Sequence, residues 1–190
     1  MKIVFTIIAT TLGLIGFLPY LRDILKLKTK PHIYTWLIWS ITQTTAVIGI
    51  IKGGGSWGGL NLIVGTIFVI AISIFSIKYG SKNITKRDTI ILILAILSII
   101  VWWQLKQPIL SIIMISIIDL VEYIPSIRKA YQDPWSETLS TWLLFSIGNI
   151  FAFMALYEYN LLTTTYLVSI TLANIVMFLI CIFRRRTIKR

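Results

Sequence analysis

The chain carries at residues 17–46 the stretch FLPYLRDILKLKTKPHIYTWLIWSITQTTA, and residues 123–152, YIPSIRKAYQDPWSETLSTWLLFSIGNIFA, align with it without a gap. The most informative identical pairs are Pro19 with Pro125, Arg22 with Arg128, Thr35 with Thr141, and Trp36 with Trp142. Apolar composition alone can match leucine and isoleucine by chance, but it does not also align a proline, an arginine and a tryptophan. The repeat therefore predicts a duplicated membrane unit.

The composition places the chain among integral membrane proteins. Of its 190 residues, 57% are hydrophobic and only 13% are charged, with a mean hydropathy of +0.86. Too few charged residues remain to cover a soluble domain of this size. About 20 residues are needed to cross a hydrocarbon layer of roughly 30 Å, and within it the backbone must be helical. Seven stretches are long enough, near residues 3–25, 33–51, 57–77, 88–105, 108–130, 138–158 and 162–183.

The formal charge of +11 is distributed in a way that predicts topology. Only Lys2, Lys52 and Lys106 fall on one side of the predicted spans, and the other 15 of the 18 basic residues fall on the opposite side. Basic residues favour the cytoplasmic side, so the N-terminus is predicted outside and the C-terminus in the cytoplasm. The charge therefore indicates orientation in the membrane and gives no reason to expect a nucleic-acid partner. Lipid headgroups are the partner expected for the basic C-terminal tail.

The repeat and the charge pattern together predict an all-α membrane protein with seven transmembrane helices. Residues 1–80 would form a first three-helix bundle and residues 108–190 a second, with residues 81–107 as a linker that contains the fourth span. Three crossings end on the opposite side from where they begin, so one extra crossing lets the second bundle start in the same orientation. The arrangement expected is a parallel 3+1+3 repeat.

Two acidic residues in the fifth span, Asp119 and Glu122, are the sharpest functional signal. They replace Gly13 and Gly16 of the first unit, where the small residues let a neighbouring helix approach closely. A carboxylate inside a membrane is costly and normally faces a cavity or a partner, which makes both residues candidates for proton coupling. The alternatives are structural. Asp119 would then bond Asn149 or Gln43, and Glu122 would pair with Arg128 or Lys129.

Other polar and aromatic residues interrupt the apolar spans. Those that could converge between the bundles, as a substrate-binding set, are Trp39, Gln43, Asn61, Phe145, Asn149 and Asn174. Hydrogen bonding between helices is the alternative role for the amides. Pro19 and Pro125 are predicted bending points, because proline removes a backbone hydrogen bond. Trp36 and Trp142 are expected to anchor the chain at the cytoplasmic interface.

These features resemble the PQ-loop/SWEET superfamily of small transporters over nearly the whole chain. The motif is a proline near the cytoplasmic end of a repeat's first helix, then a loop and a second helix containing Ser or Thr. It is present at Pro19 and Pro125, followed by Tyr and Ser rather than Gln. The resemblance implies two three-helix bundles joined by a linker helix. It also implies an asparagine facing the central path, a role that Asn61 fits, and proton coupling through a membrane aspartate such as Asp119.

The function expected is transport of a small polar solute, sugar-like or amino-acid-like, by alternating access and linked to protons. A receptor that binds a ligand on the same scaffold without moving it stays open as an alternative. A retinal protein is set aside because residues 162–183 contain no lysine for a Schiff base. We see no motif for a metal, a cofactor or an enzyme. The partners expected are the solute, the lipid bilayer and a possible oligomer, and the location expected is a bacterial inner membrane.

Overall fold

The computed structural model describes residues 1–28, 31–80 and 84–188, and the side chains of Pro125, Arg128, Lys129 and Ser136 are not among those described. Some residues used in the predictions therefore lie outside the described part. They are four that enter the charge prediction, Lys30, Lys82, Lys189 and Arg190, and the side chain of the predicted hinge Pro125. The described chain is helical and forms no strand. Its α-helices are α1 (Lys2–Leu25), α2 (Ile33–Lys52), α3 (Leu60–Tyr79), α4 (Lys86–Trp103), α5 (Pro108–Gln132), α6 (Leu139–Ala155) and α7 (Leu161–Thr187). Two 3₁₀ turns, η1 (Ser56–Gly59) and η2 (Pro134–Ser136), precede α3 and α6.

Local sequence signals explain where several helices begin. Thr85 caps α4 and Asn160 caps α7, each in a capping box with the residue three positions later. The His32 ring accepts a hydrogen bond from the Thr35 backbone amide at the start of α2. These side chains satisfy amide groups that the first turn of a helix leaves without partners.

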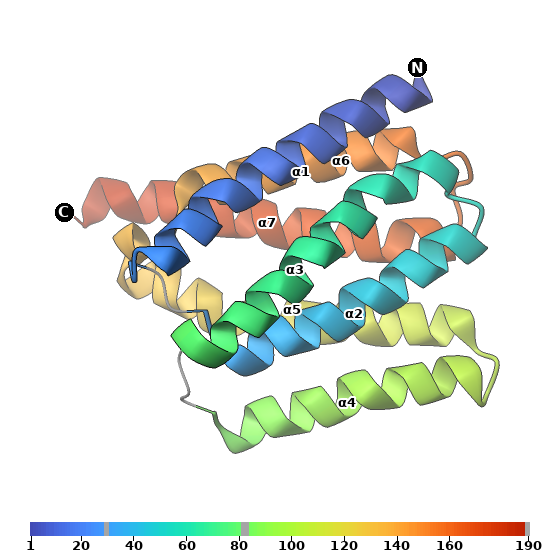
Figure 1. Ribbon diagram of the computed structural model, residues 1–190, viewed down its shortest axis with the longest axis horizontal. Coiled ribbons are helices and arrows are strands. Elements are labelled where there is room, and N and C mark those ends of the chain that lie inside the picture. Colours follow the sequence, from blue (N-terminus) through green and yellow to red (C-terminus); the bar gives the residue numbers. More distant parts are fainter. Residues whose placement is uncertain (29–30, 81–83, 189–190) are drawn as a thin grey trace.

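The helices pack in a regular order. α3 lies between α1 and α2, and α7 lies between α5 and α6. Between these two triplets, α1 packs along α6 and α2 packs along α5. α4 lies at the edge of the molecule against α2 and α5 (Figure 1).

The contact between α1 and α6 depends on small residues. A methyl group added to Gly16 would lie 2.7 Å from the Phe145 ring, and one added to Gly148 would lie 3.3 Å from the Ala9 carbonyl oxygen. One added to Gly13 would lie 2.7 Å from Asn61 Oδ1 on α3. The close approach predicted at Gly13 and Gly16 is therefore confirmed.

α4 is joined to its two neighbours in different ways. Arg87 donates to the Val121 carbonyl oxygen at 2.9 Å, and Ser111 donates to the Ser98 carbonyl oxygen at 2.7 Å, so two polar contacts connect α4 with α5. Against α2 the contact is a small apolar cluster that includes Ile38 and Ile91, with His32 Nε2 lying 3.8 Å from Asp88 Oδ2 at the start of the two helices.

The outer surfaces of the helices are apolar, which suggests a membrane protein. In the described part of the chain, four helical segments are long and apolar enough to cross a membrane: Lys2–Leu25, Ile33–Lys52, Ser56–Tyr79 and Leu161–Thr187. α6 is apolar but shorter, and α4 carries three charged residues in its first turn. Large aliphatic side chains such as Ile7, Ile67 and Ile90 are more than half exposed, as expected where lipid replaces water.

Candidate functional site

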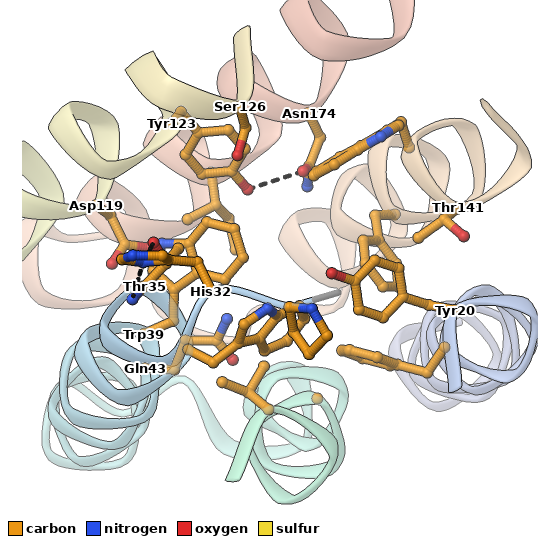
Figure 2. A pocket seen from close by; sticks show the side chains of 18 of the residues that line it. Tyr20, His32, Thr35, Trp39, Gln43, Asp119, Tyr123, Ser126, Thr141 and Asn174 are labelled. Carbon is orange, nitrogen blue, oxygen red and sulfur yellow. Dashed lines mark hydrogen bonds between the residues drawn. The ribbon is translucent and has the colours of Figure 1, made fainter. Parts of the chain in front are cut away.

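A cavity of about 610 Å³ opens between the two triplets, and residues from all seven helices line it. This volume lies within the range of roughly 300–1,000 Å³ that is common for small-molecule sites. Figure 2 shows labelled side chains from α1, α2, α5, α6 and α7 around the space. The predicted set of Trp39, Gln43, Asn61, Phe145, Asn149 and Asn174 all line this cavity, together with Asp119.

The two ends of the cavity differ. At the end near the starts of α2, α4 and α6, which we call the mouth, the lining includes His32, Thr85, Arg87, Asp88 and Glu137. These residues are polar or charged, and none of them is predicted to lie deep in the membrane. The mouth is on the side that carries most of the basic residues.

At the opposite end the helices are drawn together by hydrogen bonds. The Lys2 ammonium donates to the Met154 carbonyl oxygen at 2.9 Å and to the Tyr159 hydroxyl at 3.0 Å. Thr6 donates to the Trp57 carbonyl oxygen at 3.3 Å. Gly58 packs so closely on Leu156 that a methyl group there would lie 2.7 Å from its Cα. We call this the sealed end.

Two of the four amides predicted to line the path, Asn61 and Asn149, meet. Asn61 Nδ2 donates to Asn149 Oδ1 at 3.3 Å, which joins α3 to α6. Both residues are buried and both line the cavity. Interhelical bonding and cavity lining, which the sequence presented as alternatives, therefore occur together at this pair.

Asp119 is buried, with 2% of its surface exposed, and its carboxylate is held by two hydroxyl groups. Tyr166 on α7 donates to Oδ2 at 2.6 Å, and Thr42 on α2 donates to Oδ1. The structural alternative considered from the sequence named Asn149 or Gln43 as its partner. The observed partners are different because the face of α2 that meets α5 presents Thr42.

Glu122 lies one turn further along α5 and is also fully buried. Its Oε2 accepts a hydrogen bond from Thr35 at 3.1 Å, and Thr35 Oγ1 lies 3.1 Å from His32 Nδ1. His32 Nε2 is 3.8 Å from Asp88 Oδ2 at the mouth. The predicted pairing of Glu122 with Arg128 or Lys129 falls on side chains outside those described. A row of polar groups thus leads from the mouth to Glu122.

Aromatic rings form a continuous wall along the cavity. The aromatic wall consists of Tyr20, Trp36, Trp39, Tyr123 and Trp142, with successive ring centroids 5.2, 5.2, 5.3 and 6.1 Å apart. The Tyr123 hydroxyl donates to Asn174 Oδ1 at 2.9 Å, as Figure 2 shows. The predicted role of Trp36 and Trp142 as interfacial anchors is not what the structure shows, because both side chains are buried and line the cavity. Their repetition reflects the cavity wall instead.

Two lining residues, Tyr20 and Tyr123, and the Asp119 partner Tyr166 were not identified from the sequence. Tyr123 follows Asp119 by four positions and so shares its helix face, a signal that was available. For Tyr20, the one available signal was that it directly follows the predicted bending point Pro19 in α1. Tyr166, which bonds Asp119 from α7, gives no local signal at all.

Comparison with family models, with curated proteins and with solved structures found no match to this chain.

Proposed function

We propose that this chain is a membrane transporter of a small polar solute, sugar-like or amino-acid-like, that works by alternating access. The observation that carries the proposal is the cavity of about 610 Å³, which is lined by amides, aromatic rings and a buried carboxylate. Beyond one end of it, hydrogen bonds of Lys2 and Thr6 join α1 to α6 and η1. A polar cavity at this position between apolar helices is the feature that transporters use to shield a solute from lipid.

The packing order supports a duplicated architecture within the proposal. If α1, α2 and α3 correspond to α5, α6 and α7, the central place of α3 corresponds to that of α7. The contact of α1 with α6 then corresponds to that of α5 with α2. This is the arrangement expected for two parallel three-helix units joined by α4, as in the PQ-loop/SWEET superfamily. The seven helices would then all cross the cell membrane, with the N-terminus outside.

Alternating access requires the sealed end to open while the mouth closes. The contacts of Lys2 with Met154 and Tyr159 join α1 to the end of α6 and the segment after it, so they would break in that step. Pro19, inside α1, and Pro125, within α5, are the proposed bending points. Solute held in the cavity would then face the outer side.

Proton linkage is part of the proposal and rests on Asp119. An ionised carboxylate within a membrane costs several kcal/mol, so its protonation and release would change the balance between the two states. Protonation of Asp119 would alter its hydrogen bonds with Thr42 on α2 and Tyr166 on α7, and so would act directly on both helices.

The proposal is tested by uptake into liposomes that contain the purified full chain. We expect saturable uptake of at least one labelled sugar or amino acid, increased by a proton gradient. Asp119→Asn should remove the gradient's effect, whereas the control Glu158→Gln, at an exposed carboxylate before α7, should retain it. Tight solute binding without uptake would reject transport and favour a receptor on the same scaffold.

A further inference from the structure

The aromatic wall is the first of three observations that identify a class of solute. Aromatic faces carry a negative electrostatic potential and attract cations, tryptophan most strongly. Trp36, Trp39 and Trp142 all line the cavity together with Tyr20 and Tyr123. Four helices contribute to this wall, so it surrounds part of the space and does not cover only one side of it.

The second observation is the carboxylate of Asp119 beside that wall. Asp119 precedes Tyr123 by one helical turn on α5, and Tyr123 lies against Trp39 with ring centroids 5.3 Å apart. Among the described residues, Asp119 forms no ion pair, unlike Asp23, which pairs with Arg22, and Asp88, which faces His32. Its two hydroxyl partners satisfy hydrogen bonds but supply no positive charge.

The charged groups at the mouth do not neutralise the interior. Among the described lining residues, the basic side chains are His32 and Arg87. His32 faces Asp88, and Arg87 donates to the Val121 carbonyl oxygen at 2.9 Å. Glu122 lies one turn from Asp119 on α5, bonded to Thr35, and is not itself among the residues that line the cavity. Away from the mouth, the described lining therefore combines the carboxylate of Asp119 with aromatic rings and contains no basic side chain.

The third observation is a donor that has no acceptor. The Trp39 side chain is 8% exposed, and its indole Nε1 has no hydrogen-bond partner among the described residues. A buried N–H group without a partner costs free energy, which an oxygen atom of a bound solute would recover. The Trp39 residue lines the cavity, and a solute oxygen that reached Nε1 would supply the acceptor that this donor lacks.

From these three observations we propose that the solute is a small organic cation, an amine or quaternary ammonium compound that also carries a hydroxyl or carbonyl oxygen. Its charge lies between the aromatic wall and Asp119, and its oxygen accepts a hydrogen bond from Trp39 Nε1. This inference rests on the proposed function and specifies the solute that it leaves open.

The test compares choline, ethanolamine and tetramethylammonium with 3,3-dimethylbutan-1-ol, which has the shape of choline without the charge. Binding to the purified full chain is measured by the fluorescence of its seven tryptophans and by calorimetry. We expect at least one cation to bind, and choline to bind at least 10-fold more tightly than its uncharged analogue. This comparison needs no variant and therefore does not depend on how a substitution folds.

Variants then test whether the aromatic wall and the Asp119 carboxylate bind the cation. Trp39→Leu should weaken binding of the cation by about 5-fold to 30-fold, the range expected for a desolvated cation–π contact. Trp39→Phe, which keeps a ring, should weaken it less, and Asp119→Asn should weaken it by about 10-fold or more. The matched control Trp103→Leu changes a side chain that is 78% exposed on α4 and should leave binding unchanged.

The inference is overturned if none of the three cations binds, if the uncharged analogue binds as tightly as choline, or if Asp119→Asn leaves cation binding unchanged. Uptake by liposomes separates this failure from failure of the proposed function. Uptake of a neutral sugar without cation binding would retain transport and reject the cation. Choline binding without choline uptake would retain the cation and reject transport.

Discussion

Replacing Gly58 with alanine tests whether the sealed end is as tightly packed as the structure indicates. The added methyl carbon would lie 2.7 Å from the Leu156 Cα and 2.8 Å from its backbone nitrogen. Side-chain carbon atoms do not approach this closely, and the obstacle is backbone, which cannot rotate away. Either η1 or the end of α6 must move, and such overpacking costs about 1–3 kcal/mol.

The matched control is Gly65→Ala in α3, which is expected to stabilise the fold, whereas Gly58→Ala is expected to destabilise it. A methyl group at Gly65 would find its nearest neighbour, Phe17 Cε2, at 3.8 Å, an ordinary contact distance. With no clash, alanine in a helix interior is favoured over glycine by about 0.5–1 kcal/mol.

Thermal unfolding of the purified chain in detergent, followed by far-ultraviolet circular dichroism at one scan rate, measures both effects. At roughly 2–4 °C per kcal/mol for a chain of this size, Gly58→Ala should lower the Tm by about 2–12 °C. Gly65→Ala should leave the Tm unchanged or raise it by up to about 4 °C. An unchanged Tm for Gly58→Ala, or a lower Tm for Gly65→Ala than for Gly58→Ala, would refute the packing described for the sealed end.

Three further predictions use the same protein. Thr42→Val removes a donor to the buried carboxylate and should destabilise the fold by about 1–3 kcal/mol, whereas Thr44→Val, on the exposed face of α2, should change stability by less than about 0.5 kcal/mol in the same unfolding assay. Cys181 is the sole cysteine and is fully buried, so a maleimide should label the native chain slowly and the denatured chain at once; rapid native labelling would contradict its burial. In a Cys181→Ser background, an impermeant maleimide should label Trp57→Cys in intact cells but Arg186→Cys only after permeabilisation, and the reverse pattern would contradict the predicted orientation.

The helices were largely predictable because their signals are local. The predicted spans 33–51 and 108–130 correspond to α2 at Ile33–Lys52 and α5 at Pro108–Gln132. Apolar runs and the basic or glycine-rich segments between them each extend over a few residues, so one sequence is sufficient to place them. Small residues in α1 similarly indicated a close helix contact.

The partners of the site residues were less predictable. Helical periodicity places Asp119 on a face of α5, but the rotation and height of α7 decide that Tyr166 reaches it across 47 positions of sequence. The prediction that Trp36 and Trp142 lie at the membrane interface was wrong for a related reason. A tryptophan near a helix end suits both a membrane interface and an aqueous cavity, and only the packing of neighbouring helices distinguishes the two.

The unequal attachment of α4 bears on how the proposed rocking motion would proceed. Hydrogen bonds from Arg87 and Ser111 fasten this helix to α5 at two heights. Along its length α4 meets α2 through the apolar cluster of Ile38 and Ile91, and the contact of His32 with Asp88 lies only at the start of the two helices. When the two halves of the molecule move relative to each other, α4 should move as a rigid body with the second half and slide along the first. A disulfide locking α4 to α2 should consequently arrest the cycle, and one locking it to α5 should let it run.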